Sequence, residues 1–269
     1  KSLNHMAIQT IANQQARNLA LSAQGFQKTF SSLEEVLETT HVFQLDSVNV
    51  FERAHLLPAF SRMGAYPLAD FEKWAFSEPQ IAEDWAHCAG LVSKTDWALF
   101  EFRRHESLAR QSVQTMLKEQ AKTISWIKSE IASNGPMTVS QFEHDQNKRR
   151  GNWWGWSEVK LLLERLYDAG LLVSAGRTKF SRLYALPEQV QLPKPTLSIE
   201  AQKLALISKS VAAIGVGTAE DIADYFRFRT TDVKPMLKQL VETGHVVEVQ
   251  VQGWEKPGFA PASLDLDQT

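Results

Sequence analysis

Apolar residues recur along the chain mostly at the spacing of amphipathic helices. The pattern over residues 6–24 predicts one such helix. Ser31 can cap a second helix, because Glu34 then stands at the N3 position of a capping box. Residues 95–131 predict long helices, which end at the Asn-Gly-Pro sequence at 134–136. The chain is therefore expected to be mainly helical.

Two later stretches share one order of elements. After residue 136 the pattern predicts a short strand, a helix over Ser157–Ala169 and two strands joined by a basic turn at 175–179. Three helices between residues 197 and 242, followed by a valine-rich strand, repeat that order. The helix-ending phrases LLLERLYDAGLLV and PMLKQLVETGHVV match closely and lie about 75 residues apart, which indicates tandem copies of one module. Helix, turn, helix and hairpin is the winged-helix order.

These patterns predict an α+β fold, mainly α with short β-hairpins, built from tandem winged-helix (helix-turn-helix) repeats. Residues 1–115 are expected to form a diverged first module, residues 116–190 a second and residues 196–269 a third. Three prolines separate the last two modules and mark a linker. Within the first module, residues 41–54 fit either a strand or a turn that leads into a helix.

The composition excludes several classes of protein. Of the 269 residues, 43% are hydrophobic and 22% are charged, which is ordinary for a soluble globular protein. The sequence has no apolar run of roughly 18 residues for a membrane span and no apolar signal-peptide core at its start. Cys88 is the only cysteine, so neither a disulfide framework nor a cysteine-based zinc site is expected. We therefore expect a cytoplasmic protein without a bound metal.

The charge is distributed unevenly, although the formal net charge is only −2. Residues 91–190 contain 15 basic and 11 acidic residues, and the remainder contains 14 and 20, so the middle carries +4 and the flanks −6. A mildly basic middle is consistent with one phosphate-facing surface, and equally with chance.

Four phrases of the sequence resemble a known family. They are QLDSVNVFERAHLLPAFSRMGAY at 44–66, DWAHCAG at 84–90, GNWWGWSEVKLLLERLYDAGLL at 151–172 and RTKFSRLYAL at 177–186. In combination they resemble the YcaQ/AlkZ family of winged-helix DNA glycosylases, over nearly the whole chain. The resemblance implies excision of alkylated bases and unhooking of interstrand crosslinks in double-stranded DNA, without a cofactor.

The central motif and the length of the chain can be compared with those of the family. Gln44-Leu45-Asp46 is similar to the Q-x-D branch (AlkX/YcaQ-like), which has broad specificity, whereas the Q-x-Q branch is tied to self-resistance against one natural product. Family members are expected to carry a further carboxy-terminal segment beyond the counterpart of Thr269.

Gln44 and Asp46 are the candidate catalytic residues. On an extended segment both face one way, while Phe43 and Leu45 face the other. An alkylated purine of this kind already carries a positive charge, so the leaving base needs little protonation. Asp46 can stabilise an oxocarbenium-like sugar and act as general base for water, which the Gln44 amide can hold. The alternative is that the two side chains cap a helix or turn.

Three further residues are candidates for lining the site. Asn49 and Arg53 follow on the same segment, and Arg53 can grip a phosphate or fix Asp46. The alternative for Arg53 is a structural surface ion pair. His87 lies in an apolar run, where it either lines the site or is a satisfied core histidine. It has no partner at metal-ligand spacing, so no metal site is expected.

A separate group of residues is expected to contact DNA. These are Ser61, Arg62, Lys148, Arg149, Arg150, Trp153, Arg177, Lys179 and Arg182. The first two precede a glycine in a predicted loop, the next four combine phosphate contact with stacking, and the last three lie on the predicted wing. The alternatives are a solvated loop, tryptophans packed as core, and a charged edge strand.

Two classes of function remain open. One is an enzyme, a monofunctional DNA glycosylase that acts as a monomer on the bacterial nucleoid. The other is a non-catalytic regulator of transcription with tandem winged helices, and a protein-interaction adaptor is a weaker third. The helix over 157–169 carries three carboxylates against two cations, so readout of the major groove by its surface is poor. This observation favours modules used as a scaffold around DNA.

Overall fold

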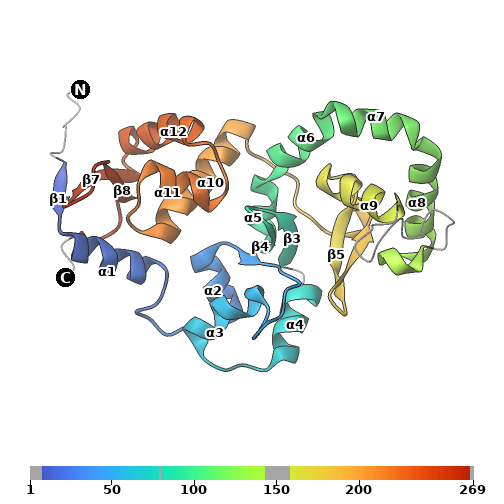
Figure 1. The fold of residues 1–269 in the computed structure, drawn as a ribbon, viewed down its shortest axis with the longest axis horizontal. Coiled ribbons are helices and arrows are strands. Elements are labelled where there is room, and N and C mark those ends of the chain that lie inside the picture. Colours follow the sequence, from blue (N-terminus) through green and yellow to red (C-terminus); the bar gives the residue numbers. More distant parts are fainter. Residues whose placement is uncertain (1–7, 79, 143–157, 267–269) are drawn as a thin grey trace.

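Three units of similar topology, each with a small sheet, follow one another along the chain (Figure 1). The computed structural model describes residues 8–78, 80–142 and 158–266. The predicted architecture, mainly helical with short hairpins, is confirmed. Within the described residues, no helix is both long and apolar enough to cross a membrane.

The first unit holds an antiparallel sheet in the order β2-β4-β3. Its elements are α2 (Leu33–Thr40), β2 (Phe43–Gln44), the 3-10 helix η1 (Ala54–Leu56), α3 (Leu57–Met63), α4 (Leu68–Ser77), β3 (Ile81–Trp85) and β4 (Ala89–Ser93). Ser32 begins α2, because its side chain accepts a hydrogen bond from the backbone N–H of Glu35 at 3.2 Å. The cap therefore lies one residue beyond the predicted Ser31, whose hydroxyl instead donates to the Glu35 carboxylate.

The segment 41–54, which the sequence left undecided, forms a two-residue strand and then a loop. Phe43 pairs with Leu91 and Gln44 with Gly90. A Cβ atom on Gly90 would lie 2.7 Å from the Val42 side chain and 3.3 Å from the Phe43 carbonyl oxygen. Glycine at this position therefore lets β2 approach β4 closely.

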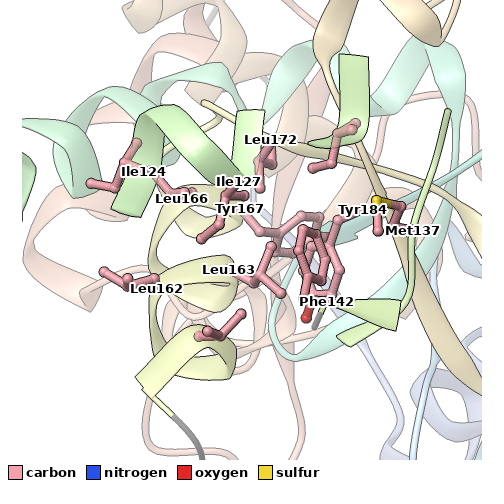
Figure 2. Close-up of a cluster of buried hydrophobic side chains, with 12 residues drawn as sticks. Ile124, Ile127, Met137, Phe142, Leu162, Leu163, Leu166, Tyr167, Leu172 and Tyr184 are labelled. Carbon is pink, nitrogen blue, oxygen red and sulfur yellow. The ribbon is translucent and has the colours of Figure 1, made fainter. Parts of the chain in front are cut away.

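The second unit packs two helices against a hairpin. Its elements are α8 (Ala121–Asn134), the 3-10 helix η2 (Val139–Gln141), α9 (Glu158–Asp168), β5 (Val173–Thr178) and β6 (Ser181–Ala185). Ile124, Ile127 and Ile131 lie three and four residues apart on α8, so they form one apolar stripe. Figure 2 shows Ile124 and Ile127 of this stripe close to Leu163 and Leu166 of α9 in a buried core that includes Tyr184 of β6. Met137 forms a bridge with Tyr184, as the short strand of this unit.

The hairpin of the second unit is tighter than the sequence suggests. The predicted five-residue turn at 175–179 is mostly strand, and only Lys179 and Phe180 lie between β5 and β6. Both have positive φ, 47° and 66°, which is the geometry that a two-residue hairpin turn with right-handed twist requires. The tip of this hairpin reaches the first unit, where Phe180 packs against the core around Phe71.

The third unit contains both ends of the described chain. Its elements are α10 (Ile199–Ile214), α11 (Ala219–Tyr225), α12 (Thr230–Glu242), β7 (Val246–Val251) and β8 (Gly258–Pro261), with the 3-10 helix η4 (Pro187–Gln189) before them. β1 (Gln9–Ile11) joins this sheet, parallel to β7, and α1 (Asn13–Ala23) follows it beside α10 (Figure 1).

This placement confirms the helix predicted over residues 6–24 only for Asn13–Ala23, because Gln9–Ile11 before it form a strand in the sheet of the third unit. Ile11 is 1% exposed in one core with Val249 and Val251. Tertiary packing on a distant strand therefore overrides the local helical pattern. A helical arch of α5 (Lys94–Leu99), α6 (Glu101–Ala109), α7 (Gln111–Glu119) and α8 connects the first two units (Figure 1).

Candidate active site

Gln44 and Asp46 lie on the solvent side of the edge strand of the first sheet. Phe43 and Leu45 are 0% and 7% exposed, whereas Gln44 is exposed and Asp46 is half-buried. The backbone N–H of Leu45 donates to the carbonyl of Ala89 at 2.8 Å, which continues the ladder past the end of β2. The expected alternation is present, and it brings the carboxamide and the carboxylate to one face.

The Asp46 carboxylate is held by its own loop. Its Oδ1 accepts a hydrogen bond from the backbone N–H of Val48 at 2.9 Å, as in an Asx turn. Among the described residues, no hydrogen bond or ion pair engages Oδ2. One oxygen is thus fixed, and the other is available to a water molecule or a sugar.

A cavity of about 560 Å³ opens beside Gln44. It brings together Gln44, Ser61, Arg62 and His87, four residues that the sequence singled out, whereas Asp46 is not part of its wall. Apolar residues of η1 and α3 supply much of the remaining lining. The volume falls in the range of small-molecule sites, and Gln44 lies in the wall of this cavity.

His87 lies in the turn between β3 and β4 and is half-buried. Burial, together with the charges of Arg227 and Arg103, lowers its pKa below the ordinary 6.5. The imidazole is therefore neutral at pH 7. Its Nδ1 is buried and has no hydrogen-bond partner among the described residues, and the residue lines the cavity beside Gln44.

Three lining residues come from the third unit and were not predicted. Asp224 and Tyr225 end α11, and Arg227 follows in a turn with a left-handed φ of 54°. Arg227 is paired with Asp224. The Tyr225 hydroxyl donates to the carbonyl of Thr40 at 2.5 Å and so joins α11 to α2. Burial raises the pKa of Tyr225 to about 12. No sequence motif reaches these positions, which lie about 180 residues beyond Gln44.

Arg53 points to the second unit rather than to Asp46. Its guanidinium lies 4.3 Å from the centre of the Phe180 ring, on the hairpin tip. No ion pair joins Arg53 to Asp46, although both residues are described, and the buried Nε of Arg53 has no partner. Arg53 lines a separate cavity of about 460 Å³ that also includes Lys179. Asn49 is exposed in the loop after Asp46.

Ser61 and Arg62 lie in the last turn of α3, which corrects the predicted loop. The Nε of Arg62 donates to the Gln24 carbonyl at 2.7 Å, and its Nη1 donates to the Pro58 carbonyl at 3.0 Å. The guanidinium also covers the Phe26 ring at 4.5 Å. Arg62 thus ties α3 to the end of α1, while Ser61 is exposed.

Two arginines of the predicted wing belong to a buried charge cluster. Arg177 and Arg182 each donate to the Glu83 carboxylate, with shortest distances of 2.6 Å. Their side chains are only 11% and 7% exposed. This pairing engages both guanidinium groups within the protein, and the DNA contact predicted for the two residues stays a prediction. Lys179 is exposed at the hairpin tip, and its predicted contact stands as a prediction.

The remaining predicted contacts lie outside the described residues. These are Lys148, Arg149, Arg150 and Trp153. Across the described ranges, no cluster of three or more His, Cys, Asp or Glu side chains is placed to hold a metal ion.

The three units, each of helices and a small sheet, define a mainly helical α+β protein. The family model described as "DNA glycosylase AlkZ-like" matches residues 37–268, and the chain belongs to this family of DNA glycosylases. DNA is therefore its partner. The solved structure of Streptomyces sahachiroi DNA glycosylase AlkZ is similar in fold, with a TM-score of 0.60 and 14% sequence identity. The match covers 94% of this chain and 70% of that chain.

Proposed function

We propose that this chain is a monofunctional glycosylase for alkylated purines in double-stranded DNA. The substrates are N7-alkylguanine-type monoadducts and interstrand crosslinks, and the enzyme acts at the nucleoid as a monomer without a metal or cofactor. The observation that carries the proposal is that Gln44, at the end of β2, and Asp46, two residues beyond it, face solvent on one side, with Gln44 in the wall of a cavity.

The reaction breaks the bond between C1′ of the sugar and N9 of the purine. The electron pair leaves with the base, which becomes neutral because alkylation had made it cationic. The sugar develops positive charge, which the Asp46 carboxylate stabilises. A water molecule held by the Gln44 amide adds to C1′, and Asp46 Oδ2 accepts its proton. The product is an intact abasic strand.

The cavity beside Gln44 supports this role for the pair. The neutral ring of His87 lines the same cavity as the Gln44 amide. The walls of this cavity come from the first and the third unit. A large alkyl group on the base therefore does not have to enter a pocket within a single unit. This feature favours crosslinks and bulky adducts as substrates.

In the first two units, the helices that would read the major groove, α4 and α9, argue against a transcription regulator. In α4 the described charges are Asp70, Glu72 and Lys73, so the helix is acidic. In α9, Glu164 pairs with the buried Arg182. Neither helix presents the basic surface that binding to the phosphate-lined groove requires.

The test uses a duplex with one N7-methylguanine, followed by alkaline cleavage of any abasic site. Asp46→Asn should lower excision on the order of 10²-fold or more while DNA affinity stays unchanged. Asp70→Asn, an exposed aspartate on α4, is the matched control and should excise normally. Strand cleavage before alkali would contradict the monofunctional assignment, and near-normal excision by Asp46→Asn would remove this residue from the mechanism.

A further inference from the structure

The loop that follows the Gln44–Asp46 pair presents apolar side chains to solvent. Val48, Val50 and Phe51 are 62%, 79% and 97% exposed, more than any other large apolar side chain of the described residues. Removing an apolar side chain from water lowers the free energy of the system. Three of them on one short loop indicate that the loop is covered when the protein functions.

The loop is held at both ends. At its start, Leu45 is hydrogen-bonded to Ala89 at 2.8 Å, and Asp46 accepts from Val48 at 2.9 Å. At its end, Arg53 stacks on Phe180 at 4.3 Å, and the following helix η1 is anchored by the buried Leu56. The tip therefore projects from a fixed base and does not fold back onto the protein.

The position of the loop identifies what covers it. Phe51 lies five residues beyond Asp46, and an extended chain spans at most about 3.6 Å per residue, so the two are within roughly 18 Å. Successive base pairs are about 3.4 Å apart along each strand. If Asp46 acts on a nucleotide, Phe51 must therefore lie within about five base steps of it. The base stack is the apolar surface that a duplex offers at this distance.

We infer that Phe51, supported by Val50, inserts between base pairs beside the lesion and unstacks the duplex there. Apolar wedges of this type kink DNA in other contexts, and phenylalanine is one of the residues used. Unstacking would let Asp46 approach C1′ from outside the helix. The inference rests on the proposed function, because it takes the Gln44–Asp46 pair as the point where the damaged nucleotide is held.

The experiment uses the full chain and a duplex with 2-aminopurine next to a 2′-fluoro N7-methylguanosine, which resists excision. The fluorescence of 2-aminopurine rises when it loses stacking. We expect a severalfold rise with the wild type and with Phe51→Leu, and little or none with Phe51→Ala. Phe60→Ala is the matched control, because Phe60 is 57% exposed but lies on α3, outside the loop. This control should give the wild-type signal.

Excision rates supply a second readout. On a fully paired N7-methylguanine duplex, Phe51→Ala should reduce the single-turnover rate by about tenfold or more. Opposite an abasic site the stack is already weakened, so the loss should be much smaller. Equal losses on both substrates would overturn the wedge and indicate a general defect.

The outcomes separate the inference from the proposed function. A full fluorescence rise with Phe51→Ala would overturn the wedge, while continued excision by the wild type would leave the glycosylase proposal standing. A wild-type protein that unstacks DNA but excises nothing would support the wedge and contradict the proposed function. A change of oligomeric state in Phe51→Ala, measured by sedimentation with the fluorescence rise intact, would show that a second copy covers the loop and would overturn the inference.

Discussion

Replacing Glu83 by glutamine tests the buried charge cluster that joins the first two units. Glu83 is 5% exposed and accepts hydrogen bonds from Arg177 at 2.9 and 2.6 Å, from Arg182 at 2.8 and 2.6 Å, and from the Ser174 hydroxyl at 3.1 Å. The isosteric change Glu83→Gln keeps the shape of the side chain. It removes the only carboxylate that pairs with Arg177 among the described residues, and it turns an amide donor toward the guanidinium donors.

The expected loss of stability is large. Breaking a buried ion pair on one side costs about 3–5 kcal/mol, because the remaining charge is left without compensation. Arg182 keeps a second partner in Glu164 at 2.7 Å, so the loss falls mainly on Arg177. For a chain of this size each kcal/mol lowers Tm by about 2–4 °C. Glu83→Gln should therefore lower Tm by roughly 10 °C.

Scanning calorimetry at pH 7 measures the effect, with Glu242→Gln as the matched control. Glu242 is 60% exposed and pairs with Lys238 at 3.9 Å, so its loss should cost less than about 1 kcal/mol. Burial alone would raise the pKa of Glu83, but Arg182 and Arg177 outweigh it and hold the pKa below the ordinary 4.5. The stabilisation is then present above pH 4.5 and lost below it. In acid, the Tm of Glu83→Gln should therefore approach the Tm of the wild type and of the control. Equal Tm values for Glu83→Gln and the wild type at pH 7 would refute the reasoning.

Three further predictions concern pH, salt and substrate. Burial lowers the pKa of His55 from 6.5 to about 4, so the unfolded state binds the proton first and stability should fall by about 3 kcal/mol as the pH drops through that window; unfolding scans of the wild type and His55→Phe would show the slope only in the former. Affinity for undamaged duplex should fall steeply with salt, and removing Lys148, Arg149 and Arg150 together should weaken binding to all sequences alike; a sequence-selective footprint would indicate a regulator. Single-turnover excision of an N7-methyl and a bulky N7 mustard adduct should agree within about tenfold, and a loss of several hundred-fold for the bulky adduct would show a closed pocket.

Local patterns predicted most of the fold because each unit is stabilised largely by its own core. The stripe of Ile124, Ile127 and Ile131 on α8 is visible in the sequence and is buried in the structure. Prediction failed where contacts between distant segments decide the conformation. Ile11 has helical spacing with its neighbours, yet it lies in a strand because Val249 and Val251 bury it.

The same limit applies to the site. Alternation predicted that Gln44 and Asp46 share a face, since that depends only on an extended backbone. It gave no sign that Arg227 lines the cavity, because this contact depends on how the third unit docks on the first. Nothing in the sequence pattern showed that Arg177 and Arg182 of the hairpin pair with a buried carboxylate, because a charged edge strand and a buried ion cluster look alike in sequence. Only the position of Glu83, about 94 residues earlier in the chain, distinguishes them.

The position of His87 is set by charges that lie outside the cavity. Successive residues of a strand face opposite sides, and on β3 Glu83 faces the hairpin of the second unit while Asp84 is paired with Arg104 of α6. Hydrophobic burial is not directional. Apolar packing alone would therefore allow the hairpin of β3 and β4 to slide or rotate between its neighbours. The ion pairs of Glu83 with Arg177 and Arg182 on one face, and of Asp84 with Arg104 on the other, fix its position instead. The turn with His87 therefore stands at a defined distance from the Gln44 strand, and loosening either pair should impair the site as well as stability.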